Sequence, residues 1–154
     1  WSAQSSGTTQ NLAGVWGSDV NNVWAVGNSG TILKWNGSTW SSQPSGTIQN
    51  LSAVWGSDAN NIWSVGYFGT ALRWNGSAWS SQSTGAMPSL AGVWGSDTNN
   101  VWAVGLGGAI LRWNGSAWSS QYSGTTQSLA GVWGSNSSNI WAVGSYSLLH
   151  YLPY

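Results

Sequence analysis

The stretch from Gly14 to Trp40 reads GVWGSDVNNVWAVGNSGTILKWNGSTW, and it decides the fold because the chain repeats it with small changes. Four tryptophans, spaced 39 residues apart, mark the repeat: Trp1, Trp40, Trp79 and Trp118. Self-similarity at such a period is typical of architectures in which each repeat is one supersecondary unit. We therefore divide residues 1–154 into four repeats that start at these tryptophans and form a single domain.

Each repeat contains four short segments that read as β-strands. They are the apolar runs LAGVWGS, NVWAVG and TILKW and the more polar WSSQ, separated by turn residues. No segment carries the apolar period of a helix. Four antiparallel strands in about 40 residues, repeated, are typical of a propeller blade. The sequence predicts an all-β fold, a β-propeller of four-stranded antiparallel blades with four blades per chain.

These residues resemble a known family of repeats. The stretch from Gly14 to Trp40 is similar to the blades of BNR/Asp-box-type propellers, including photosystem-assembly-factor-like ones. The ending RWNGSAW is more distantly similar to tectonin-type lectin repeats. Both resemblances imply the propeller fold. Asn36, Asn75 and Asn114 stand where the Asp-box turn has Asp, so sialidase-like activity does not carry over.

Ring closure leaves two alternatives. The chain begins in the fourth strand of a blade, Trp1 to Ser5, and ends in the third, Leu148 to Leu152. We expect the N-terminal strand to complete the C-terminal blade, because this removes an exposed sheet edge. A join within one chain gives four blades, and a join between two chains gives a homodimer with eight.

Composition excludes several classes of partner. Charged residues make up 4% of the chain and the formal net charge is zero, so no basic surface is available for nucleic acid. No apolar run is long enough to span a membrane. The absence of cysteine excludes disulfides and thiolate metal sites, and we expect neither a metal nor a cofactor. Richness in Ser, Thr, Asn, Gly and Trp is more typical of an exported protein than of a cytosolic one.

Acid–base chemistry lacks the residues that it needs. The chain has no Glu and no Cys, and its sole histidine is His150. The carboxylates occur one per repeat, so a close acid/base pair would need the turns of two blades to converge. We predict that the chain is not an enzyme.

Charged residues follow the repeat as pairs. An Asp in the first hairpin turn accompanies a basic residue near the end of the third strand: Asp19 with Lys34, Asp58 with Arg73, and Asp97 with Arg112. At a strict spacing of 39 the fourth repeat has Asn136 and Tyr151 instead, so both charges are lost together. We interpret the pairs as structural ion pairs. The alternative is that each Asp accepts hydrogen bonds from its turn.

Two sets of aromatic residues are candidate ligand-binding residues. The first set lies on the polar fourth strand, where an indole can stack on a sugar or pack between blades: Trp40, Trp79 and Trp118. The second set breaks the repeat, in turns and links that we expect to share one face of the ring: Tyr67, Phe68, Tyr122 and Tyr146. Exposed aromatic residues suit a partner or ligand, and drift at tolerant loop tips is the alternative.

Two functions follow from these candidates. The first is a noncatalytic, lectin-like module with shallow repeated sites for a glycan. The alternative is a structural or protein-interaction scaffold that has no small-molecule ligand. The Asn-Gly pair in each NGS segment predicts a tight hairpin turn whichever function holds.

Overall fold

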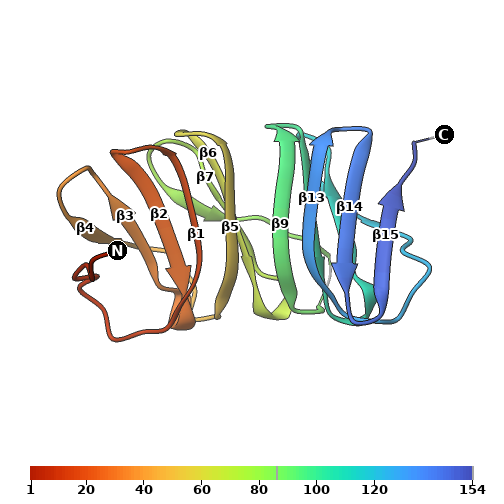
Figure 1. Cartoon of the computed structure of the whole chain (residues 1–154), viewed down its shortest axis with the longest axis horizontal. Helices are drawn as coiled ribbons and strands as arrows, with labels where there is room; N and C mark the ends of the chain where they lie inside the picture. The colour runs from red at the N-terminus through yellow and green to blue at the C-terminus, as the bar shows by residue number, and fades with distance from the viewer. Residues whose placement is uncertain (86, 154) are drawn as a thin grey trace.

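The computed structural model describes residues 1–85 and 87–153. The chain forms four antiparallel sheets in succession (Figure 1), which we call blades 1 to 4. Blade 1 contains β1 (Leu12–Asp19), β2 (Asn22–Gly27), β3 (Ile32–Trp35) and β4 (Trp40–Gln43). Blade 2 contains β5 (Leu51–Asp58), β6 (Asn61–Gly66), β7 (Ala71–Trp74) and β8 (Trp79–Ser81). Blade 3 contains β9 (Leu90–Asp97), β10 (Asn100–Gly105), β11 (Ile110–Trp113) and β12 (Trp118–Gln121). Blade 4 contains β13 (Leu129–Asn136), β14 (Asn139–Gly144) and β15 (Ser147–Tyr151).

The strands confirm the propeller prediction. Each of the first three blades has four strands hydrogen-bonded in chain order, and blade 4 has three. A 3-10 turn joins the second strand to the third in blades 1 to 3: η1 (Asn28–Gly30), η2 (Tyr67–Gly69) and η3 (Leu106–Gly108). No described helix is long and apolar enough to cross a membrane.

The four blades form an open arc. The first strands pack in succession, β1 on β5, β5 on β9 and β9 on β13. Figure 1 shows these four strands side by side, with blade 1 extending to the left and blade 4 to the right. The two ends of the arc are therefore separate faces of the molecule.

The structure does not show the expected closure by the N-terminal strand. Residues 1–11 form no strand, and β15 has no neighbour on its outer side among the described residues. The N-terminus and β15 lie on opposite sides of the arc (Figure 1), so Trp1 to Ser5 have no partner strand at hand. A segment without a partner strand cannot satisfy its backbone groups in a sheet, which explains its irregular conformation.

The core lies between the blades. The second strands of blades 1 to 3 are buried on both faces along most of their length, and the indoles of Trp24 and Trp63 are completely enclosed. Trp24 contacts Trp74 of the next blade with ring centroids 4.9 Å apart, and Trp63 contacts Trp113 at 4.8 Å. Each buried indole removes on the order of 150–250 Å² from water. Contacts between neighbouring sheets therefore supply most of the apolar burial.

The tryptophans of the first strands lie on glycines of the next blade. The pairs are Trp16 on Gly56, Trp55 on Gly95, and Trp94 on Gly134. A Cβ built on any of these three glycines would lie 2.6 Å from the facing indole. The absence of a side chain is thus what lets adjacent first strands approach each other.

The NGS segments form the predicted turns, with a different geometry. Trp35 pairs with Trp40, so the loop contains the four residues 36–39 rather than two. The Asn36 side-chain oxygen accepts hydrogen bonds from the backbone N–H groups of Ser38 and Thr39, at 3.0 and 2.9 Å. Only the glycine has a positive φ, 96° at Gly37. The asparagine therefore acts as a side-chain cap of the turn.

Blade 4 departs from the strict spacing of 39. Val104 pairs with Ile110 across five residues in blade 3, whereas Val143 pairs with Leu148 across four in blade 4. This shorter turn shifts β15 by one position, so the partner of Trp141 is His150, as the partner of Trp102 is Arg112. The equivalence of Tyr151 with the basic residues was wrong. His150 takes that place, and Tyr151 takes the place of the third-strand tryptophan.

We expect Gly95→Ala to lower the free energy of unfolding by about 1–3 kcal/mol, because the new methyl group meets the Trp55 indole. Urea unfolding followed by tryptophan fluorescence measures the change. In a Trp55→Leu background the same substitution should cost clearly less, because the smaller side chain leaves room. Equal costs in both backgrounds would contradict the indole-on-glycine contact as the cause.

Candidate functional site

One end of the sheets gathers the variable segments, as predicted. The backbone N–H groups of Asn28, Tyr67, Leu106 and Ser145 donate to the carbonyls of Asn11, Asn50, Ser89 and Ser128, each at 2.9 Å. These bonds hold the turn after each second strand against the link that enters the same blade. We call this surface the tip face: turns 28–31, 67–70, 106–109 and 145–146, with links 44–50, 83–85, 87–89 and 122–128.

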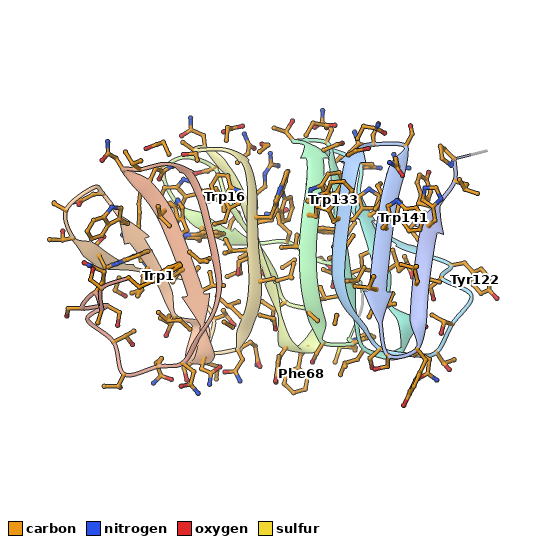
Figure 2. The ribbon with its side chains drawn as sticks, viewed as in Figure 1. Trp1, Trp16, Phe68, Tyr122, Trp133 and Trp141 are labelled. Atoms are coloured by element: carbon orange, nitrogen blue, oxygen red, sulfur yellow. The ribbon has the colours of Figure 1, made fainter. Side chains whose placement is uncertain are left out.

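The tip face exposes apolar and aromatic side chains. Phe68 is 62% exposed and Tyr146 is fully exposed, and Figure 2 shows Phe68 at the lower edge of the blades. Tyr67 is also exposed, and so is Tyr122, which lies at the C-terminal end of the arc in Figure 2. The exposed aliphatic neighbours are Ile48, Met87 and Leu106. The structure thus places Tyr67, Phe68 and Tyr146 in the turns of the tip face, whereas Tyr122 lies in a link at the C-terminal end of the arc.

Two of these aromatics have a left-handed backbone. Phe68 has a φ of 54° and Tyr146 a φ of 56°, and Ser29 has 55° at the equivalent place in blade 1. Blade 3 has Gly107 there, with a φ of 65°. This conformation costs a bulky L-residue roughly 1–2 kcal/mol, and glycine avoids the cost. An exposed ring at a strained position gains no compensating burial, which makes these two rings candidates for binding.

The tip face carries no charge. Its turns and links contain no Asp, Glu, Lys, Arg or His. The three Asp residues lie at the opposite end of the strands, in the turns between first and second strands. A ligand of the tip face would therefore meet rings, hydroxyls and amides.

The fourth-strand tryptophans lie mostly in the core between blades. Trp79 contacts Trp24 edge-on at 5.4 Å, and Trp118 contacts Trp63 in the same way at 5.0 Å. Trp118 is only 7% exposed, and the indole nitrogens of both Trp79 and Trp118 are buried. Trp40 has no preceding blade in the chain and is half-buried beside Trp35. Their packing leaves little ring surface for a sugar.

An asparagine stands between each Asp and its basic residue in blades 2 and 3. Arg73 donates to the Asn61 side-chain oxygen at 2.8 Å, and the Asn61 amide donates to Asp58 at 3.3 Å. Arg112 and Asn100 repeat this arrangement with Asp97, at 2.9 and 3.0 Å. Among the described residues no direct ion pair joins an Asp to Lys34, Arg73 or Arg112. The charges are coupled through the amide instead.

The basic side chains also lie over indoles of two neighbouring blades. The guanidinium carbon of Arg73 is 5.6 Å from the ring centroids of both Trp63 and Trp113. Lys34 lies in the same way over Trp24 and Trp74. In blade 4, His150 stacks on Trp141 at 4.0 Å and hydrogen-bonds Asn139 at 2.9 Å. Every blade therefore places a nitrogen-bearing side chain against its second-strand indole.

Turn hydrogen bonds stabilise the charged form of each Asp. At Asp19 the backbone N–H of Asn21 and the hydroxyl of Ser18 lower the pKa. At Asp58 and Asp97 burial disfavours the carboxylate, but hydrogen bonds from the neighbouring Ser and Asn residues outweigh it, so the pKa is again below its ordinary value. These carboxylates are structural parts of their turns. The described residues contain no cluster of three or more His, Cys, Asp or Glu that could hold a metal ion.

The two ends of the arc are apolar and unpaired, which sequence reasoning missed. Trp133 of blade 4 is 59% exposed because no described blade packs on it, and Figure 2 shows it on the fourth blade. At the other end, Gly17 of blade 1 has no indole upon it. Val15 and Leu12 of β1 are exposed, whereas their equivalents in blades 2 and 3 are buried. The sequence does contain a signal for these contacts, because each packed tryptophan of a first strand is followed 40 residues later by the glycine on which it lies.

Searches against protein-family models and against curated proteins found no match. Solved structures do match. "YCF48 from Cyanidioschyzon merolae" has a TM-score of 0.76 at 22% identity, over 94% of this chain and 52% of that one. "YCF48 bound to D1 peptide" has a TM-score of 0.72 at 20% identity, over 95% of this chain and 51% of that one. The likeness supports the propeller fold, and this chain spans about half the length of each neighbour.

Stability should fall in acid, below about pH 4. The pKa values of Asp19, Asp58 and Asp97 are lower in the folded chain than the ordinary value near 3.9. The stabilisation is therefore complete above that value and is lost as the pH falls through the folded pKa values. Urea unfolding between pH 2 and 6 measures this dependence.

The chain supplies its own control, because Asn136 replaces the Asp in blade 4 and accepts the same turn hydrogen bond, from Ser138 at 2.9 Å. Replacing all three Asp by Asn should keep the fold and flatten the dependence between pH 2 and 4. If the stability of this variant fell with pH as much as that of the parent, the three Asp residues would not be the cause of the acid dependence.

Proposed function

We propose that this chain is a noncatalytic, protein-binding propeller module whose tip face binds uncharged, apolar protein segments. The observation that carries the proposal is the pair of exposed rings, Phe68 and Tyr146, on left-handed backbone where glycine would fit without strain. Aromatic side chains provide much of the binding energy at protein interfaces. A strained, exposed ring is best explained by a contact made outside the chain.

The chemistry of the tip face specifies the kind of segment. Its turns and links are uncharged, so a charged partner gains no ion pair there and loses hydration on binding. Phe68, Leu106 and Met87 offer apolar contact area, and the hydroxyl of Tyr146 offers a hydrogen bond at its rim. An uncharged segment with apolar anchors matches this surface.

The comparisons support the alternative of a scaffold more than the glycan hypothesis. One of the two structural neighbours is YCF48 with a D1 peptide bound to it, so a propeller of similar fold binds a peptide. A glycan site on the fourth strands would need the indole faces of Trp79 and Trp118, which pack against other rings. No contact in the structure favours a sugar over a peptide.

The proposal includes a homodimer that completes an eight-bladed ring. Four blades make an arc whose ends point in opposite directions (Figure 1). In the proposed dimer, two such arcs join end to end into a ring of eight blades. The ends are complementary, because exposed Trp133 lacks a glycine to cover and Gly17 lacks an indole. Closed symmetric rings leave no such face unsatisfied.

Peptide display tests the tip face. We expect a random peptide library to yield binders with apolar anchors and few charges. The variant that carries Phe68→Gly and Tyr146→Gly should bind a selected peptide at least about tenfold more weakly, because two contact rings are lost. Fluorescence anisotropy of the labelled peptide measures the affinity. The variant should unfold at no lower urea concentration than the parent, because glycine relieves the backbone strain.

Ser29→Gly is the matched control, since it makes the same backbone change without removing a ring. Its peptide affinity should equal that of the parent. Unchanged peptide binding by the double variant, or failure to select any peptide beside clear hits on a glycan array, would reject the proposal in favour of the lectin-like hypothesis.

Light scattering tests the ring. The parent should have the mass of two chains, each of 16.2 kDa, and Trp133→Ala should have the mass of one. Trp133 is exposed within a single chain, so its loss should leave the monomer folded. Trp94→Ala, the equivalent change inside the arc, should instead lower stability by about 3–5 kcal/mol. A monomeric parent at all concentrations would exclude the dimer.

A further inference from the structure

A groove runs along the outer edge of blade 4. It encloses about 360 Å³ and is lined by Trp102, Ile110, Leu149, His150 and Tyr151, among others. One wall is β15, whose outer backbone groups have no strand partner among the described residues. The other wall is the neighbouring face of blade 3. In the first three blades this place beside the third strand holds a fourth strand.

The groove lacks one indole. Trp24 and Trp63 each contact two rings of the next blade, one tilted and one edge-on. Trp102 has the tilted contact, with Tyr151 at 4.7 Å and 55°. The edge-on ring, which Trp79 and Trp118 supply in the earlier blades, has no counterpart at Trp102 among the described contacts. The groove therefore has the shape and chemistry to receive a tryptophan at the start of a strand.

The N-terminal segment matches this requirement residue by residue. Trp1 is fully exposed, and the sequence from Trp1 to Gln4 reads WSAQ, close to the WSSQ of the fourth strands. In blade 3, Trp113 pairs with Trp118 and Arg112 with Ser119. The same register places Trp1 opposite Tyr151 and Ser2 opposite His150.

In this structure the N-terminal segment lies far from the groove of its own chain, which favours a segment from another molecule. Figure 2 shows Trp1 at the opposite end of the arc from Tyr122, which lines the groove. Insertion from a second copy leads directly through residues 6–11 into the partner's β1, as β12 leads into β13 within the chain. That path brings Val15 and Gly17 of the partner against the exposed end of blade 4. Strand insertion and end-face packing are then one event.

We infer that the groove beside β15 is the binding site for residues Trp1 to Gln4 of a second copy of this chain, which add the fourth strand of blade 4. The inference rests on the proposed dimer and specifies how the dimer closes. Each copy gives one strand and receives one, so both exposed sheet edges disappear. Backbone hydrogen bonds supply the adhesion, as in other cases of strand addition, and the Trp1 pocket sets the register.

Cysteine cross-linking tests the register, because the chain has no cysteine of its own. Ser2→Cys combined with His150→Cys places two thiols directly opposite each other in the inferred pair, at a separation that a disulfide spans. Both positions are exposed, so each substitution should leave the chain folded. On mild oxidation we expect most of the chain to migrate as a covalent dimer on a non-reducing gel. Ala3→Cys with His150→Cys, which is out of register, should cross-link far less.

The remaining outcomes separate this inference from the proposed ring. A cross-linked species of monomer mass would show closure within one chain and overturn both. No cross-link beside a dimeric mass in light scattering would overturn strand insertion and leave the ring intact. As a second measurement, Trp1→Ala should raise the dissociation constant of the dimer at least about tenfold. An unchanged constant would reject the Trp1 pocket.

Discussion

The packing of an indole onto the next sheet is the constraint on which this structure depends. The chain has six acidic and basic side chains in total and no cysteine, so neither ion pairs nor disulfides can hold it together. In blades 1 to 3 the first-strand tryptophan instead rests on a glycine one blade later, as Trp55 does on Gly95. In such a repeat each unit is stabilised by its neighbours. The same dependence leaves the first and last blades with one unsatisfied face each.

The sequence predicted the strands of the blades well because the first three strands of each repeat have apolar runs and the turns contain glycine or asparagine. The strand predicted at Trp1 to Ser5 is absent. The sequence also predicted that the turn after each second strand lies beside a link between blades, since alternate strand ends lie together in an antiparallel sheet. The prediction was wrong at β15, because a fixed spacing of 39 residues does not detect a deletion inside a turn. It therefore matched Tyr151, rather than His150, with Lys34, Arg73 and Arg112. Aligning LLH of the fourth repeat with ILR of the third would have revealed it.

The contacts of the charged residues differ from the direct ion pairs that we interpreted from the sequence. Asp58 and Arg73 are coupled, but through Asn61, and that asparagine has an equivalent in every repeat, where it read as turn filling. A chain of hydrogen bonds of this kind depends on side-chain conformations, which the spacing of residues along the sequence does not predict. The sequence could not predict how the ring closes, for a different reason. It depends on whether a strand finds its partner in the same chain or in another, which local propensity does not determine.

The left-handed position in the turn after each second strand has a wider consequence. Its four occupants are Ser29, Phe68, Gly107 and Tyr146, and in all four blades the first three strands pair in the same order. The side chain at this one position in each repeat is thus not constrained by packing between the blades. Natural or laboratory selection can therefore substitute these four residues independently and produce new binding surfaces on the same fold.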